Sequence, residues 1–289
     1  MTADGSDRSS WKGRNRFLDF AESPAEAGNS ASLGMTIMVV DSDFSQDMHG
    51  SRSRIGIVAA LEREVRPLIR KWRASEKEWD GRRFRFFEKN DAVLICGGMG
   101  AEGARRATEA MIAVYAPPMI HSAGFAGALD AKLKVGDVVE PRRVVNAGDG
   151  SSISLEQGEG VLVSFASVAS PEQKVKLREA FAAQVVDMEA AAVARAAELR
   201  GVGFAAVKVI SDDSEFVFPG LERFVDSSGQ FLEARFMLFV ALRPWLWPQV
   251  ARLARNSRLA VHALCERLET ICLHPVSAGG DRIEAMNRQ

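Results

Sequence analysis

The sequence contains few of the residues on which disulfide and metal chemistry depend. It has three cysteines, Cys96, Cys265 and Cys272, and no two of them form a CxxC pair. Its four histidines lie far apart along the chain. We therefore expect neither a disulfide framework nor a zinc site, and we predict no metal and no other cofactor. A reducing cytoplasm is the setting that this cysteine content favours.

Excess charge and long apolar segments are also missing. The 37 basic and 38 acidic residues give a formal net charge of −1, which is unlike the basic footprint of a nucleic-acid-binding protein. No run of 18 or more uncharged apolar residues occurs, so no membrane-spanning helix is expected. The first residues lack the basic-then-apolar order of a signal peptide. What is present is 47% hydrophobic residues over 289 positions, enough for a sizeable core.

The chain divides by composition into three parts. Residues 1–52 show no sustained hydrophobic period, so we expect either disorder or a spurious extension from an upstream start codon, with Met48 just ahead of the first convincing strand. Residues 53–270 are expected to form the folded domain. Residues 271–289 are expected to form a flexible tail.

Within the folded part, strand-like and helix-like segments alternate. Apolar or alternating runs predict strands at 54–61, 82–89, 92–98, 119–127, 135–145, 160–168 and 204–210. Helical spacing predicts helices at 62–72, 101–115, 171–182 and 188–201. The strand at 119–127 is expected to break at its glycines. This alternation predicts an α/β fold with a mostly parallel sheet covered by helices.

The C-terminal third has a different character. Residues 221–268 are expected to be largely helical, with interruptions at Pro244 and Pro248, and they are rich in Phe, Leu and Trp. We expect these apolar side chains to pack on the core or on a subunit interface. The alternative is a lid or surface that meets an apolar substrate or a membrane.

A glycine motif follows the predicted strand at 92–98. Gly98, Gly100 and Gly103 satisfy the GxGxxG pattern of dinucleotide-binding proteins between a strand and a helix. That pattern also requires an acid at the end of the next strand, and 119–127 offers none. We therefore interpret the glycines as a turn whose backbone approaches a ligand or a neighbouring strand.

Acidic residues follow several of the predicted buried strands. Glu62 and Glu64 come after the first strand, Glu189 follows the strand-like residues 183–187, and Asp212 ends another strand. Ligands of open parallel sheets bind outside the carboxyl ends of the strands, so we expect these four acids to converge on one crevice. The alternative for each glutamate is structural, because an acid that opens a helix is favoured by the helix dipole.

Five segments, taken together and in order, resemble the motifs of the purine nucleoside phosphorylase and nucleosidase family. They are GIVAALEREV (56–65), CGGMGAEGA (96–104), SAGFAGALDAKLKVGDVV (122–139), VVDMEAAAVA (185–194) and KVISDDSE (208–215). The resemblance implies a three-layer α/β/α sandwich around a mixed, partly barrel-like sheet. It also implies assembly as a homo-oligomer, with a purine nucleoside as the small-molecule partner.

The resemblance further implies a role for individual residues in cleavage of the bond between ribose and purine. Asp212 matches the aspartate that protonates the departing base at N7, and its pKa is expected to rise through burial against the preceding apolar strand. Glu189 matches the glutamate that binds the ribose hydroxyls, and Glu64 the glutamate that activates water, with Glu62 as the alternative. The remaining substrate-binding positions are Met188, Gly97, Gly98, Ser211 and Phe125.

Two reactions remain open within the family. No GDPxR-type phosphate loop follows the first strand, and AALEREV resembles the nucleosidase branch, which uses water. However, Gly97 stands where that branch has a serine, and Arg105 and Arg106 could hold an anion. Phosphate-dependent cleavage is therefore the alternative. A non-catalytic nucleoside-binding module is a further alternative, but such a module has no need of an acid and a water activator together.

The C-terminal segment FVDSSGQF…ALRPWLWPQVARLARNS is similar to a narrower group within the family. That group comprises the hopanoid-associated phosphorylases, which remove adenine from adenosylhopane, a lipid-linked nucleoside. This resemblance implies an adenine nucleoside that carries a lipid, and peripheral membrane contact through apolar C-terminal helices.

Overall fold

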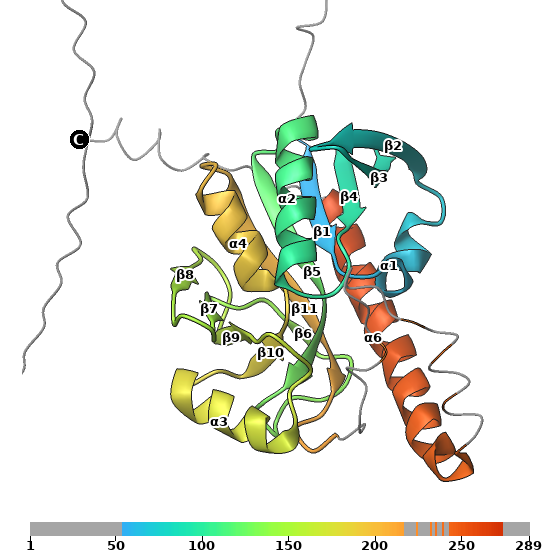
Figure 1. Cartoon of the computed structure of the whole chain (residues 1–289), viewed down its shortest axis with the longest axis vertical. Coiled ribbons are helices and arrows are strands. Elements are labelled where there is room, and N and C mark those ends of the chain that lie inside the picture. Colours follow the sequence, from blue (N-terminus) through green and yellow to red (C-terminus); the bar gives the residue numbers. More distant parts are fainter. Residues whose placement is uncertain are drawn as a thin grey trace, which may run out of the picture. The chain divides into compact units, whose positions relative to one another are not determined.

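A computed structural model describes residues 54–216, 224, 232, 235, 239 and 243–273. The extension predicted for residues 1–52 lies outside the described residues, and so does most of the predicted tail. The described part is built around an eleven-stranded mixed sheet with helices on both faces (Figure 1). This architecture confirms the α/β fold class predicted from the sequence.

The sheet combines a parallel centre with antiparallel edges. Its strands are β1 (Ile55–Ala59), β2 (Arg73–Trp79), β3 (Arg82–Lys89), β4 (Ala92–Cys96), β5 (Met119–Ala128), β6 (Val138–Val139), β7 (Arg143–Asn146), β8 (Ser152–Ser154), β9 (Val161–Ser164), β10 (Val185–Asp187) and β11 (Gly203–Asp212). The order is β2-β3-β4-β1-β5-β10-β9-β7-β8, and β11 pairs with β5 and β6. Strands β1, β4, β5 and β11 are parallel, whereas β10 runs antiparallel to β5. The sheet branches at β5 and does not close into a barrel.

Two apolar layers join the sheet to its helices because successive strand residues point to opposite faces. The helices are α1 (Glu62–Ile69), α2 (Ala101–Tyr115), α3 (Pro171–Phe181), α4 (Ala190–Glu198) and α6 (Trp247–Leu273). On one face, Ile57 packs with side chains of α1 and α6. On the other, its neighbour Val58 packs with α2 and α4, which lie side by side (Figure 1). The three-layer prediction is thus confirmed.

Strands β5 and β2 are two of the places where the structure differs from the sequence-based expectation. Strand β5 does not break at its glycines but continues to Ala128, because it pairs with β11 from Met119 to Gly127. Strand β2 was not predicted, since RASEKEW has neither an apolar run nor a clear alternation. It forms at the edge of the sheet, where a charged strand is tolerated because one side faces solvent.

The C-terminal helix α6 also differs from the expectation. Pro248 does not interrupt it, because it lies in the first turn, where proline is tolerated. The helix is not apolar on every side: Ala260, Leu264 and Leu268 pack into the core at helical spacing, whereas the charged Arg258 and Glu266 are exposed. Among the described residues, no helix is long and apolar enough to cross a membrane.

Candidate active site

Glu64 is a buried carboxylate in the first turn of α1, directly after β1. Helical spacing turns it inward with Val65 and Leu68, and only 6% of its surface is exposed. Its carboxylate accepts a hydrogen bond from the backbone N–H of Phe125. Its Oε2 atom has no hydrogen-bond partner in the described part of the chain. A buried carboxylate oxygen without a partner costs free energy, so it needs an explanation.

The surroundings of Glu64 change its acidity. Burial, and then the nearby negative charge of Glu189, raise its pKa from 4.5 to about 7. The positive charges of Arg63 and Lys208 act in the opposite direction without cancelling this effect. A carboxylate with a pKa near neutrality can accept a proton efficiently at neutral pH.

Glu189 lies at the N-cap of α4 and faces the glycine turn that follows β4. The backbone N–H of Gly100 donates to its Oε1 at 2.7 Å, and that of Met188 to its Oε2 at 3.2 Å. Burial and the neighbouring charge of Asp187 raise the pKa of Glu189. The glycine turn therefore brings backbone against a carboxylate, because Gly100, with φ 90°, adopts a conformation that favours glycine.

A buried ion pair supports these two glutamates. The Nζ of Lys208 on β11 lies 2.8 Å from Oδ2 of Asp187, and both side chains are almost completely buried. Although burial acts to lower the pKa of Lys208, the charges of Asp187, Glu189 and Glu64 raise it. Asp187 also accepts hydrogen bonds from the hydroxyl of Ser164 and from a backbone N–H of α4. One ammonium thus compensates a cluster of three carboxylates.

Neither member of this ion pair was predicted as a site residue. A lysine within the apolar run FAAVKVI is a signal that could have revealed it, because a charge in a buried strand requires a partner.

Asp212, at the end of β11, has a different environment. The Nζ of Lys174 donates to its Oδ2 at 2.5 Å, and the hydroxyl of Ser211 donates to its Oδ1 at 2.8 Å. The sequence predicts apolar surroundings for this carboxyl, whereas the structure provides a buried ammonium. Lys174 was not predicted as a site residue, because the pattern of α3 does not distinguish it from the exposed Lys176.

Two glycines of β5 make room for the carboxylates. A Cβ at Gly124 would lie 3.0 Å from Oε2 of Glu64, and a Cβ at Gly127 would lie 2.9 Å from Oδ2 of Asp212. Gly124 also has φ 153°, which disfavours other residues. Both acids therefore lie against bare backbone of the same strand, which explains why these glycines occur inside a strand.

The predicted convergence of four acids is correct only in part. Glu64 and Glu189 belong to one buried charged cluster, and Asp212 lies four residues beyond Lys208 on β11. Glu62 does not join them, because its half-exposed side chain pairs with Arg85 at 3.3 Å on the surface. Two residues, or about half a helical turn, separate the inward Glu64 from the outward Glu62, so the register favours Glu64. The remaining predicted side chains, Met188, Ser211 and Phe125, are all partly buried.

Gly97 and Gly98 continue the pairing of β4 beyond its last residue. Their backbone N–H groups donate to the carbonyls of Ala59 and Ala60, each at 2.9 Å. A Cβ at Gly97 would lie 2.6 Å from the carbonyl oxygen of Gly103 in α2. The departure from the serine of the nucleosidase branch therefore has a packing reason, because the start of α2 lies too close for a side chain.

We expect Gly97→Ser to destabilise the protein by about 1–3 kcal/mol, since backbone must move to admit the new side chain. Chemical unfolding measures this change. The matched control is Gly148→Ser in an exposed turn, where a Cβ lies 3.3 Å from a side-chain oxygen and no backbone oxygen obstructs it. Equal stability of the two variants would contradict the packing explanation.

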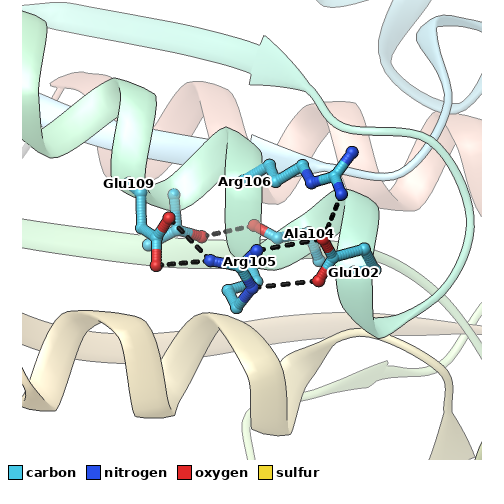
Figure 2. Close-up of polar contacts among 6 residues, drawn as sticks. Glu102, Ala104, Arg105, Arg106 and Glu109 are labelled. Carbon is cyan, nitrogen blue, oxygen red and sulfur yellow. Dashed lines mark hydrogen bonds and ion pairs between the residues drawn. The ribbon is translucent and has the colours of Figure 1, made fainter. Parts of the chain in front are cut away.

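The two arginines after the glycine turn are engaged by acids of their own helix. Arg105 pairs with Glu102 and Glu109 through bonds of 2.7–2.9 Å, and Arg106 pairs with Glu102 at 2.5 Å (Figure 2). Both side chains are at least one-third exposed. This arrangement is that of surface ion pairs on a helix and does not prepare an anion site.

Comparison with known proteins places this geometry in a family. The sequence profile of the phosphorylase superfamily matches residues 54–166 and 159–241. The chain belongs to this superfamily. Its curated relatives include 5'-methylthioadenosine/S-adenosylhomocysteine nucleosidases of Staphylococcus aureus, which are 29% identical over 223 residues, an alignment that covers 62% of this chain and 97% of the relative. The family predicted from the five sequence motifs is thereby confirmed.

Solved structures agree on the fold. The 5'-methylthioadenosine/S-adenosylhomocysteine nucleosidase of Helicobacter pylori matches with a TM-score of 0.57 and 19% identity over 77% of this chain and 98% of that chain. Futalosine hydrolase of Helicobacter pylori matches with a TM-score of 0.55 and 20% identity over 75% of this chain and 98% of that chain. The 5'-methylthioadenosine/S-adenosylhomocysteine nucleosidase of Neisseria meningitidis, solved with methylthio-immucillin-A, matches with a TM-score of 0.52 and 21% identity. That match covers 74% of this chain and 98% of that chain.

Proposed function

We propose that this protein is an enzyme that hydrolyses the N-glycosidic bond of an adenine nucleoside. Its family membership and its nucleosidase relatives support this class of reaction. The observation that carries the choice of water as nucleophile is Glu64, a buried carboxylate with an unpaired oxygen and a pKa of about 7.

The proposed reaction separates charge between the sugar and the base. As the bond from C1′ to the base breaks, its electrons leave with the base, and the ribose becomes positively charged. Asp212 in its protonated form gives its proton to N7 of the base and returns to the carboxylate that Lys174 and Ser211 contact. Meanwhile, Glu64 accepts a proton from the water that attacks C1′. Glu189, held by two backbone N–H groups, accepts hydrogen bonds from the ribose hydroxyls and stabilises the developing positive charge.

The charges around Glu64 favour water over phosphate. When Asp187, Glu189 and Glu64 are ionised, they outnumber the ammonium of Lys208, so an incoming phosphate dianion would be repelled. The arginines of α2 that could have held phosphate are engaged by Glu102 and Glu109. The same carboxylates suit a neutral water molecule whose proton must be removed.

We therefore expect adenine release without phosphate, with a free hydroxyl at C1′ of the sugar product. The measurement is adenine release from adenosine derivatives with different 5′ substituents, with and without phosphate, followed by mass analysis of the sugar. Ribose 1-phosphate as the main product, with turnover that saturates in phosphate, would instead make this a phosphorylase. Binding of these nucleosides without any turnover would favour the non-catalytic binding module.

A lipid-linked nucleoside such as adenosylhopane is the finer substrate proposal. It is supported by Trp245 and Trp247 before and at the start of α6, with exposed fractions of 69% and 56%. Exposed tryptophans are suited to the boundary between water and lipid. In the experiment above, faster release from a lipid-bearing substrate than from methylthioadenosine would support this proposal. Homo-oligomeric assembly stays a prediction.

A further inference from the structure

Lys174 is a buried cation to which the proposed reaction has so far assigned no role. It lies on the inward side of α3 with Leu177, whereas its neighbours Val175 and Lys176 are exposed. Only 4% of its side chain is exposed. Lysine is rarely buried to this extent unless it is paired, so the contacts of its ammonium are informative.

The ammonium of Lys174 holds the end of β11 in two places. It donates to Oδ2 of Asp212 at 2.5 Å and to the backbone carbonyl of Asp213 at 2.7 Å. These bonds cross from a helix that lies 38 residues earlier in the chain to the point where the register of β11 shifts, between Ile210 and Asp212. Lys174 therefore contacts β11 at an irregular part of the strand.

The carboxyl of Asp212 is consequently fixed from two sides. Lys174 engages Oδ2, and the hydroxyl of Ser211 engages Oδ1. A Cβ at Gly127 would lie 2.9 Å from Oδ2 and 3.3 Å from Nζ of Lys174, so the ion pair packs directly on bare backbone. These contacts set the orientation of the carboxyl before substrate binds.

We propose that Lys174 is a positioning residue for departure of the base, acting through Asp212. This inference rests on the proposed role of Asp212 as the proton donor. When the proton moves from Asp212 to N7, the electrons of the bond to C1′ leave with the base, and Asp212 becomes a carboxylate. The ammonium at 2.5 Å stabilises the negative charge that develops on Asp212 during this step. Stabilisation that grows toward the transition state raises kcat more than it lowers KM.

Lys174→Met tests this role. We expect kcat to fall by about 100-fold through loss of orientation and charge, with KM nearly unchanged. Lys174→Arg keeps the positive charge and should recover part of the loss. The matched control is Lys176→Met, which removes an exposed lysine from the same helix and should leave both constants unchanged. Circular dichroism and thermal unfolding establish that each variant is folded. If Lys174→Met does not fold, Lys174→Arg and Lys174→Gln replace it in the test.

The decisive comparison repeats Lys174→Met in an Asp212→Asn background. If Lys174 acts through Asp212, the second substitution should cause no further loss of kcat. An equal loss in both backgrounds, a change confined to KM, or unchanged kcat in folded Lys174→Met would overturn the proposal. Failure of the proposed function is distinguishable, because in that case the wild-type protein would release no adenine, or Asp212→Asn alone would retain turnover.

Discussion

Glu64→Gln is expected to abolish base release and, at the same time, to make the fold more stable at alkaline pH. The amide cannot accept a proton from water, so turnover should fall by about 10²–10⁴-fold. The gain in stability follows from burial, because the native protein at pH 8 contains a desolvated carboxylate that the unfolded chain exposes to water. A pKa raised from 4.5 to about 7 corresponds to about 3 kcal/mol at pH values above both.

The pH dependence of this effect has a definite sign. Between pH 4.5 and 7 the native protein binds a proton on Glu64 that the unfolded chain has released, so the free energy of unfolding falls as the pH rises. Activity changes in the opposite direction, because protonated Glu64 cannot activate water. We therefore expect kcat/KM to decline as the pH falls below about 7, while the fold gains stability.

Urea unfolding of wild type and variant at pH 5 and pH 8 measures the stability effect. The matched control is Glu62→Gln, two residues earlier, because that half-exposed carboxylate pairs with Arg85 on the surface. The control should change neither the pH dependence of stability nor turnover. An identical loss of stability between pH 5 and pH 8 in wild type and Glu64→Gln would contradict the assignment of a raised pKa to Glu64.

The sequence predicts the centre of the fold well because burial on both faces leaves a plain signal. Strands β1 and β4 are continuous apolar runs, and β11 is apolar apart from Lys208 up to its polar end, because a strand covered by helices on both sides is mostly apolar. The edge strand β2 carries no such signal, because half of its surroundings are water. Its formation depends on pairing with β3, which composition does not reveal.

Glycines gave a misleading local signal in β5. Gly124 and Gly127 suggested that the strand ends, since glycine weakens an isolated strand. In the folded protein, their missing side chains admit the carboxylates of Glu64 and Asp212, and pairing with β11 maintains the strand. This reason becomes visible only when residues about 60 and 85 positions away along the chain are brought against β5.

The acids of the candidate site could be predicted, whereas their cationic partners could not. Each acid follows a recognisable strand within a recognisable motif, so its position at one end of the sheet follows from the topology. The partner of an acid, in contrast, is decided by tertiary packing. Lys174 and Lys176 stand two residues apart in an ordinary helical pattern, and only the docking of α3 turns one of them toward Asp212.

Asp212→Asn is expected to reduce turnover by about 10²–10⁴-fold, because an amide is far too weak an acid to protonate N7. The ion pair with Lys174 adds a second consequence. Lys174 would keep the carbonyl of Asp213 but lose its anionic partner while only 4% exposed, so we expect the fold to lose about 1–3 kcal/mol of stability. If Asp212 formed no ion pair with Lys174, the substitution would lower turnover without changing stability.

A double variant separates the two consequences of this substitution. Asp212→Asn combined with Lys174→Met removes the unpaired cation, so stability should return toward that of wild type while turnover stays low. Asp212→Asn combined with Lys176→Met should not restore stability, since Lys176 is exposed and does not contact Asp212. Urea unfolding and adenine release on the same samples provide both readouts. Near-normal turnover of a folded Asp212→Asn protein would remove Asp212 as the acid, because a proton donor that can be replaced by an amide is not the donor.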